Sequence, residues 1–429
     1  MRSTSSRRAM IAASAAVLLP SSASAAAAPM SAWHAVHMTV RPGKFYSVTA
    51  ADKRHAWAVG ESPNRHGLFA PLVARWDGAA WAPVRLPAKV QSQLGPLPLL
   101  GTVVASGPRN LWAFSLTGGW LHYNGSSWNA GLLPAVLTTT ASAVVGTHVW
   151  SFGLRPTFHA PAPYAAYATD IHGKITWKFK AMPGNATIYG ASAVSASDMW
   201  AVGTSGPIDN PLGDSGVTTR ARTPRIASSL LHYYAGRWHR AMPLPAPMRT
   251  NAATSILARS DTDIWVGGAV KNARTGTSEA IAHWNGQSWK LVQLPVAPSK
   301  SDYRIQAIMA ENLSGVWALA DCFGTHCPNH GPQSRLWHEQ AGHWTGPSRL
   351  ALISHPTVLY SLATAGSIVW AAGTVTLGKN NIHGLIADKT STEMTQRPVE
   401  RPPPFLGFAR ADTGQLSLGP YVLEAGAHR

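Results

Sequence analysis

Residues 260–295 decide the fold: they begin with SDTDIWVGGAV at 260–270 and end with IAHWNGQSWKLVQLP at 281–295. The first part places Trp265 inside a short apolar run, and the second places an Asn285-Gly286 turn before Trp289. Both patterns recur in this order along nearly the whole chain. The protein is therefore predicted to be an array of similar units, whose repeated residues build the scaffold.

The first pattern, a Trp in a short apolar run, occurs seven times. The copies are HAWAVG (55–60), NLWAFS (110–115), HVWSFG (148–153), DMWAVG (198–203), DIWVGG (263–268), GVWALA (315–320) and IVWAAG (368–373). Their mean spacing of about 52 residues, with strand-like content, predicts an all-β fold, a seven-bladed β-propeller of four-stranded blades. Each run follows another apolar segment and a polar turn, so we assign these two segments to the innermost strand and its neighbour. The Trp side chains are expected to fill the gaps between blades.

The second pattern, a polar-Gly turn followed by a Trp, occurs six times. The copies are RWDGAAWAPVRLP (75–87), HYNGSSWNAGLLP (122–134), IHGKITWKFKAMP (171–183), YYAGRWHRAMPLP (233–245), HWNGQSWKLVQLP (283–295) and HEQAGHWTGPSRL (338–350). Asn-Gly or Asp-Gly between two strand-like runs predicts a tight hairpin, because Gly supplies the positive φ that the turn needs. These segments are predicted to be the third and fourth strands of the blades.

The seventh blade lacks its own outer strand, because no Trp follows Trp370. A matching segment, SAWHAVHMTVRPG with Trp33, precedes the first inner strand. We therefore predict that residues 31–40 supply the outer strand of blade seven and close the ring, which removes an open sheet edge. The rival candidate is QLSLGPYVL at 415–423 in the C-terminal segment.

The N-terminus carries the pattern of an export signal: arginines, an apolar run from Met10 to Leu19, and a stretch of small residues. The adjacent Arg7 and Arg8 also suit the twin-arginine route, and an ordinary signal peptide is the alternative. We predict a signal peptide at 1–28, the propeller at 29–395, and a tail containing the Pro-rich run 397–405 at 396–429. The mature protein is expected to be secreted, extracellular or associated with the cell envelope.

The chain is strongly basic, with a formal charge of +17, and removal of three arginines with the signal leaves +14. Basicity could favour nucleic acid, an anionic polymer or an acidic envelope surface. No nucleic-acid motif is present, and no Lys/Arg cluster after the signal is longer than two residues, so nucleic acid is not expected. No later apolar run is long enough to span a membrane. A monomer with a generally basic surface is expected.

Two cysteines, Cys322 and Cys327 in CFGTHC, are predicted to form a local disulfide in an oxidising compartment. Nearby His326 and His330 make a zinc site conceivable, but zinc normally needs four ligands of this kind. We therefore predict no metal and no cofactor.

The D-x-W-A-V-G run followed by H-W-N-G-x-x-W resembles the Trp-rich repeats of secreted bacterial β-propeller proteins, which are similar to kelch and sialidase-type Asp-box propellers. The resemblance covers residues 31–390 and implies the propeller fold. It implies no single function, because such propellers include binding modules, lectins, lyases and hydrolases. The turns lack the Ser/Thr-x-Asp-x-Gly-x-Thr form of an Asp box, and the double Gly of kelch is absent apart from Gly267-Gly268. No catalytic set can therefore be transferred.

Catalytic motifs are absent from the sequence: there is no G-x-S-x-G, H-E-x-x-H, phosphate-binding Gly loop or EF-hand loop. His122, His232 and His283 occupy the same position in successive units, which favours a structural role. Asp residues of the repeat turns are expected to bond backbone amides. Asp209 and Asp214 could bind calcium, but two carboxylates are few for six to eight ligands.

The loops between the second and third strands vary most, and in a propeller they project from one face around the axial opening. They carry the candidate binding residues, which are Arg65, His66, Arg222, Arg225, Lys271, Arg274, Arg335 and His383. The leading hypothesis is a non-catalytic binding or scaffold propeller that recognises polysaccharide, envelope polymer or an extracellular protein. The alternative is a carbohydrate-active hydrolase or lyase with its site at the axial opening. A third hypothesis has no ligand and treats the basic charge as a means of wall retention.

Overall fold

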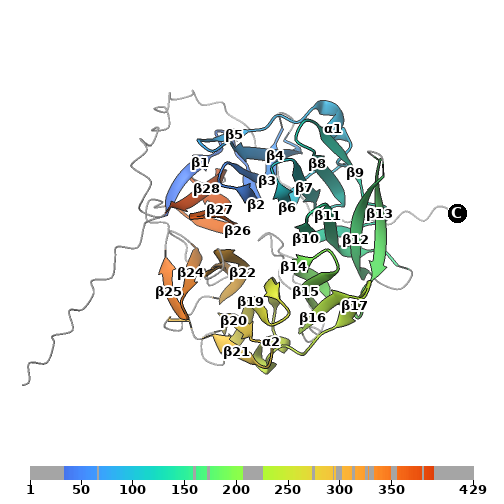
Figure 1. Ribbon diagram of the computed structural model, residues 1–429. Coiled ribbons are helices and arrows are strands. Elements are labelled where there is room, and N and C mark those ends of the chain that lie inside the picture. The colour runs from blue at the N-terminus through green and yellow to red at the C-terminus, as the bar shows by residue number, and fades with distance from the viewer. Residues whose placement is uncertain are drawn as a thin grey trace, which may run out of the picture. The chain divides into compact units, whose positions relative to one another are not determined.

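The computed structural model shows seven four-stranded antiparallel sheets arranged around a central axis (Figure 1). It describes residues 33–64, 67–157, 161–171, 174–205, 226–272, 276–292, 294–295, 302–311, 315–323, 327, 333–348, 355–378 and 381–390. The predicted seven-bladed β-propeller is therefore confirmed. We number the blades 1 to 7 in the order of their inner strands.

Each blade has the same strand order. The inner strands are β2 (Lys44–Asp52), β6 (Leu100–Gly107), β10 (Thr138–Val145), β14 (Thr187–Ser195), β18 (Ala253–Ser260), β22 (Asp302–Glu311) and β26 (Thr357–Ala365). The second strands are β3 (His55–Pro63), β7 (Asn110–Ser115), β11 (His148–Arg155), β15 (Asp198–Ser205), β19 (Asp263–Asn272), β23 (Gly315–Phe323) and β27 (Ile368–Thr376). All seven second strands carry the Trp of the first pattern, as predicted.

In blades 1 to 6 the two outer strands come from the second pattern, and in blade 7 they are β28 (Ile382–Thr390) and β1 (His34–Met38). The third strands are β4 (Phe69–Trp76), β8 (Gly119–Tyr123), β12 (Ala162–Ile171), β16 (Ala227–Tyr234), β20 (Gly276–Trp284), β24 (Ser334–Gln340) and β28 (Ile382–Thr390). The outer strands are β5 (Trp81–Pro83), β9 (Trp128–Leu132), β13 (Lys174–Ala181), β17 (Arg237–Arg240), β21 (Trp289–Val292), β25 (His343–Ser348) and β1 (His34–Met38).

The ring is closed by the N-terminal strand, as predicted. β1 pairs antiparallel with β28, with His34 opposite Asp388 and Met38 opposite Leu385 (Figure 1). Trp33 is 1% exposed and packs edge-on against Trp317 of blade 6, with ring centroids 5.7 Å apart. The first described residues therefore complete both the sheet and the inter-blade packing of the last blade. The rival segment 415–423 lies outside the described residues.

The tight hairpins form for the predicted reason. The side-chain oxygens of Asp77, Asn124 and Asn285 each accept hydrogen bonds from two backbone amides of the following turn, at 2.8–3.0 Å. The glycine after each of them has a positive φ between 89° and 97°. Because a side chain is strained in that conformation, these glycines fix the turn between the third and fourth strands.

A layer of Trp and His side chains packs between the blades, and we call it the Trp–His layer. Four histidines on third strands stack on the second-strand Trp opposite them, with centroids 3.8–4.1 Å apart: Trp112–His122, Trp200–His232, Trp265–His283 and Trp317–His338. Each histidine also bonds an acceptor at the start of the second strand or the end of the inner strand, namely Asn110, Asp198, Asp263 or Glu311. These contacts support the predicted structural role of the repeated histidines.

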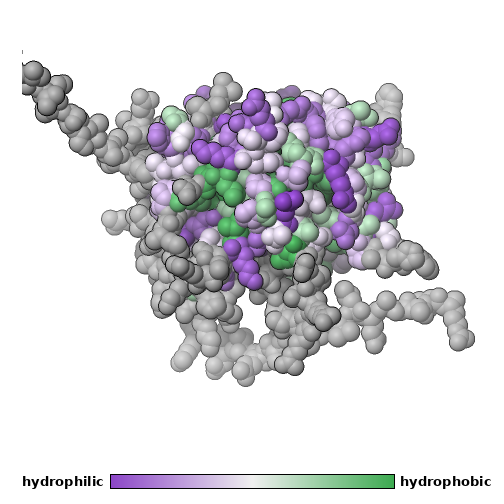
Figure 2. Space-filling model, turned by 90° about the horizontal axis from the view of Figure 1, so that it is seen from below, coloured by the Kyte–Doolittle hydropathy of each residue, from purple (hydrophilic) through white to green (hydrophobic). Residues whose placement is uncertain are grey.

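Two short helices were not predicted from the sequence. α1 (Ala88–Ser92) and α2 (Ala246–Arg249) each follow a Leu-Pro pair after an outer strand, and each buries one apolar side chain, Val90 or Met248. Proline before the first turn suits a helix start because it lacks an amide donor that would be unpaired there. No helix within the described parts of the chain is long and apolar enough to cross a membrane. Figure 2 shows hydrophilic residues spread over the visible side of the ring, between smaller hydrophobic areas.

Candidate functional site at the axial opening

Every inner strand has an irregularity at the same place. In each blade the pairing with the second strand skips one residue near the start of the inner strand, which is the pattern of a β-bulge. The skipped residues are Tyr46, Gly101, Thr140, Tyr189, Thr254, Gln306 and Tyr360. All seven line a single cavity at the axis, so we call them the axial ring. A bulge re-aims a side chain, and here each blade directs one residue to the axis.

In five of the seven blades the residue three positions after the second-strand Trp is a glycine that lies against the backbone of the bulged inner strand. A Cβ built on Gly60 would lie 1.8 Å from the carbonyl oxygen of Lys44 on the inner strand, and one on Gly373 would lie 2.0 Å from that of Val358. Gly153, Gly203 and Gly268 meet the same obstacle in their blades. Glycine in a strand marks such a close backbone approach. The repeated glycine is therefore a sequence signal for the axial ring, whereas the charged residues of the variable loops are not.

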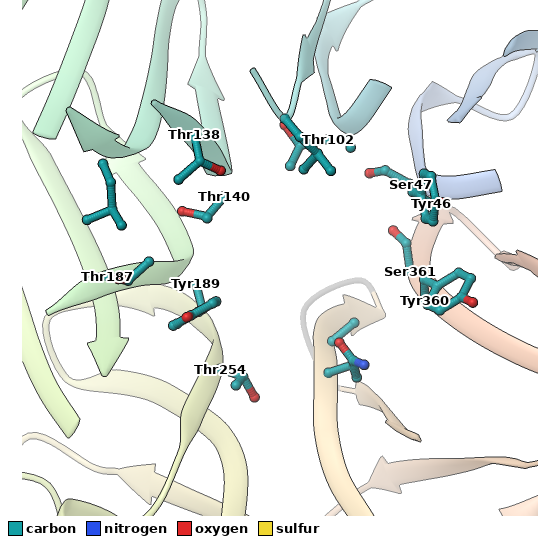
Figure 3. Close-up of a pocket in the computed structure, with 15 residues that line it drawn as sticks. Tyr46, Ser47, Thr102, Thr138, Thr140, Thr187, Tyr189, Thr254, Tyr360 and Ser361 are labelled. Carbon is teal, nitrogen blue, oxygen red and sulfur yellow. The ribbon is translucent and has the colours of Figure 1, made fainter. Parts of the chain in front are cut away.

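The cavity has a volume of about 520 Å³. Figure 3 shows Tyr46 and Tyr360 side by side on one wall and Tyr189 on the opposite side, with threonine and serine hydroxyls between them. The remaining lining residues are Ser47, Thr102, Leu116, Thr138, Leu154, Thr187, Ala307 and Ser361. Leu116 follows the second strand of blade 2, and Leu154 lies near the end of that of blade 3. The opening thus lies on the face where connections from second to third strands emerge.

Several ring side chains are held by hydrogen bonds to the frame. The Thr140 hydroxyl donates to the Ile188 carbonyl of the next blade, and the Thr254 hydroxyl donates to the Ile305 carbonyl at 2.6 Å. The Tyr46 hydroxyl donates to Glu61 Oε1 at 2.6 Å, and its ring lies 5.6 Å from that of Tyr360. The two threonine bonds join adjacent blades and the Tyr46 bond lies within blade 1, and all three fix side chains that face the axis.

Charged groups lie behind the axial ring in blades 1 and 6. Lys44 Nζ is 3.7 Å from Glu61 Oε1, and both belong to blade 1. In blade 6, Asp321 is buried beside Arg304 and accepts a long hydrogen bond from Gln306 Nε2, at 3.5 Å. Burial raises the pKa of Asp321 to about 7. Burial also raises the pKa of the Tyr189 hydroxyl, so this tyrosine is neutral at physiological pH.

None of the three predicted binding residues that lie in the described segments lines the axial cavity. Five of them, Arg65, His66, Arg222, Arg225 and Arg274, lie outside the described residues. Lys271 is exposed near the end of β19. Arg335 pairs with Glu279 at 2.8 Å and lies over the ring of Tyr303 at 3.6 Å. His383 is 8% exposed and bonds the Thr39 carbonyl at 2.7 Å. Arg335 and His383 therefore make scaffold contacts, and a basic loop face stays a prediction.

The predicted disulfide between Cys322 and Cys327 is present. Cys322 follows Asp321 at the end of β23, and its side chain is buried in the cluster of apolar residues between blades 5 and 6. The disulfide therefore fixes the start of the connection that follows β23. This point lies next to Asp321 and Arg304, the charged groups behind the axial ring in blade 6.

Comparisons with known proteins establish the fold and no family. No protein-family model matches the chain, and no curated protein matches it. Among solved structures, YCF48 bound to a D1 peptide is 14% identical, with a TM-score of 0.54 over 85% of this chain and 96% of that one. YCF48 from Cyanidioschyzon merolae is 16% identical, with a TM-score of 0.50 over 84% and 99%. An ulvan lyase of polysaccharide lyase family PL25 is 12% identical, with a TM-score of 0.50 over 81% and 95%.

Proposed function

We propose that the protein is an exported, non-catalytic binding propeller that holds an uncharged polysaccharide segment at its axial opening. The observation that carries this proposal is the axial ring, in which seven bulges place tyrosine rings and hydroxyls around one cavity. The proposal includes export of the protein and a relationship to kelch and Asp-box propellers, and both of these parts rest on the sequence patterns alone.

The chemistry of the lining suits a carbohydrate. Tyrosine rings offer flat apolar faces for the C–H faces of sugars, while hydroxyls and the Gln306 amide can exchange hydrogen bonds with sugar hydroxyls. The hydrogen bonds of Thr140, Thr254 and Tyr46 to the frame hold their side chains in place before a ligand arrives. A preorganised site loses less conformational entropy on binding.

The charge of the lining distinguishes an uncharged ligand from an anionic one. No lysine or arginine is among the described residues that line the cavity, although the whole chain is strongly basic. The anionic-polymer hypothesis therefore rests on the loop residues, most of which lie outside the described segments. An uncharged segment is the ligand class that the axial ring favours.

The enzyme alternative lacks support in the same lining. YCF48 has been solved with a bound peptide and the PL25 protein is a lyase, so this fold accommodates both binding proteins and enzymes. A glycoside hydrolase needs two carboxyl groups flanking the scissile bond. Of the 15 described residues that line the cavity, none is Asp, Glu, His, Lys or Arg. This composition favours binding without catalysis.

The proposal is tested by measuring binding of the mature protein, residues 29–429, to neutral polysaccharides, anionic polysaccharides and extended peptides. We expect binding to a neutral polysaccharide, and Tyr189→Ala should weaken it at least about tenfold, equivalent to about 1.4 kcal/mol. Tyr234→Ala is the matched control, because Tyr234 is exposed on β16 and does not line the cavity. Thermal melting confirms that both variants fold.

Three outcomes would contradict the proposal. Binding only to anionic polymers would indicate that the basic loops, and not the axial ring, form the binding site. Binding only to peptides would show that the ligand is a protein segment and not a polysaccharide. Release of oligosaccharide products during the same incubations would establish the enzyme alternative.

A further inference from the structure

The Trp–His layer contains one junction between blades that differs from its equivalents. In blades 2, 4, 5 and 6 a histidine on the third strand stacks on the Trp of the second strand and faces an Asn, Asp or Glu. At the junction of blades 4 and 5 this arrangement acquires a second carboxylate. His232 Nε2 lies 2.8 Å from Asp198 Oδ1 of its own blade and 3.7 Å from Asp261 Oδ1 of the next blade.

Asp261 is exceptional in the repeat. It lies four residues before the second-strand Trp, in the hairpin between β18 and β19. The residues at this position in blades 1 to 7 are Lys53, Pro108, Gly146, Ala196, Asp261, Leu313 and Gly366. Only blade 5 has an acid there, and its neighbour, blade 4, carries a His–Asp pair. The packing of the scaffold does not require an acid at this position, because six blades form without one.

The other two His–acid pairs of the layer have a cation nearby. Arg259 Nη1 lies 3.4 Å from Asp263, the partner of His283. The pKa of Glu311 is lowered mainly by its hydrogen bond from His338 and in part by the charge of Lys389, which lies over the Trp317 ring at 4.5 Å. Within the described segments no lysine or arginine forms an ion pair with Asp198 or Asp261. The blade 4–5 junction therefore concentrates negative charge where the equivalent junctions are balanced.

We propose that Asp198, His232 and Asp261 form a three-ligand site for a zinc-class divalent ion that joins blades 4 and 5. One ligand atom from each residue lies within 4.8 Å of the other two. Zinc bonds to nitrogen and oxygen are about 2.0–2.2 Å long, so tetrahedral ligand atoms lie about 3.4 Å apart. The observed separations bracket that value. Imidazole nitrogen with carboxylate oxygen is a donor set that suits zinc and related ions better than calcium.

The surroundings of the site fit a bound ion. The His232 ring stacks on Trp200 with centroids 3.8 Å apart and planes 11° apart, which fixes its orientation toward the two carboxylates. The Asp261 side chain is 61% exposed, so an ion can enter from solvent and water can complete its coordination. The site lies at the hairpin end of the inner strands, away from the axial ring, and is independent of the function proposed above.

The test is a calorimetric titration of the mature protein, freed of metal with EDTA, with Zn²⁺ and separately with Ca²⁺. We expect one Zn²⁺ per chain, a higher melting temperature with Zn²⁺, and no comparable effect of Ca²⁺. Asp261→Asn should weaken Zn²⁺ binding by roughly tenfold or more, because loss of even an outer-shell partner of a metal ligand costs 10- to 100-fold. The melting temperature without metal should not change, since Asp261 is exposed in a turn.

Asp77→Asn is the matched control, an exposed turn aspartate in blade 1 that should leave Zn²⁺ affinity unchanged. Asp198→Asn is the second variant and should weaken binding in the same way as Asp261→Asn. If Zn²⁺ does not bind, or if the wild type and both blade-junction variants bind it equally, the proposed site is wrong.

Discussion

The axial ring and the Trp–His layer are both built from equivalent positions in every blade, yet they differ in how far those positions vary. The second-strand Trp is present in all seven blades, and each is 7% exposed or less. The axial ring contains three tyrosines, two threonines, one glutamine and one glycine. A Trp between two sheets fills a fixed space on both sides, whereas a ring residue faces an open cavity on one side. The second-strand Trp is therefore constant where blades pack, and the ring position is free to vary where a ligand can bind.

The most severe way to disturb the Trp–His layer is to remove the strand that closes it. Deleting residues 29–40 removes β1, exposes the edge of β28 and takes Trp33 from its contact with Trp317. Loss of one buried Trp alone costs about 3–5 kcal/mol, and the open edge adds to it. We expect a large fall in melting temperature. Deleting residues 396–429 is the control, and equal melting temperatures of the full chain and the 29–40 deletion would show that the tail closes the ring.

A single substitution in each region sharpens the comparison. Trp317→Ala should lower the free energy of unfolding by about 3–5 kcal/mol, because Trp317 is 1% exposed and packs against Trp33 and His338. Tyr189→Phe in the axial ring should lower it by about 1 kcal/mol or less, because it removes only the hydroxyl and its hydrogen bond. Urea unfolding measures both values. A larger loss for Tyr189→Phe would mean that the axial ring is part of the packed scaffold.

The same difference explains what could be predicted from the sequence. The Trp pattern and the Asn-Gly turns repeat because they obey local rules of packing and backbone geometry, so they predicted the blades, the strand order and closure by Trp33. The recurrence of the histidines at 122, 232 and 283 predicts a structural role, and the stacks on Trp112, Trp200 and Trp265 agree with that role.

The candidate site was harder to predict, because ring residues do not resemble one another. Tyr46, Gly101 and Gln306 share a position only through the bulge, and a bulge adds one residue that disturbs the alternation of inward and outward side chains. Positive charge in the variable loops predicts binding residues such as Arg335. Instead, Arg335 forms an ion pair with Glu279, which depends on contacts between blades 5 and 6. Such partners are 56 residues apart in the sequence, and no local pattern connects them.

The last expected effect depends on pH and arises at Asp321, behind the axial ring. Burial raises its folded-state pKa from 3.8 to about 7, so the folded protein holds this proton more tightly than the unfolded chain does. Its contribution to stability is therefore fully present below about pH 4 and is lost as the pH rises toward 7. The slope contributed by one such group is at most about 1.4 kcal/mol per pH unit. Urea unfolding between pH 4 and 8 should show this slope in the wild type.

Asp321→Asn should remove that pH dependence, and the difference between the two proteins isolates the contribution of Asp321 from those of other titrating groups. The variant also removes the carboxylate beside the buried Arg304, so its stability should be lower at high pH, while the slope between pH 4 and 7 becomes flatter. If the wild type and the variant keep the same slope, Asp321 is ionised throughout this range. Blade 6 would then hold an ion pair between Asp321 and Arg304 behind Gln306.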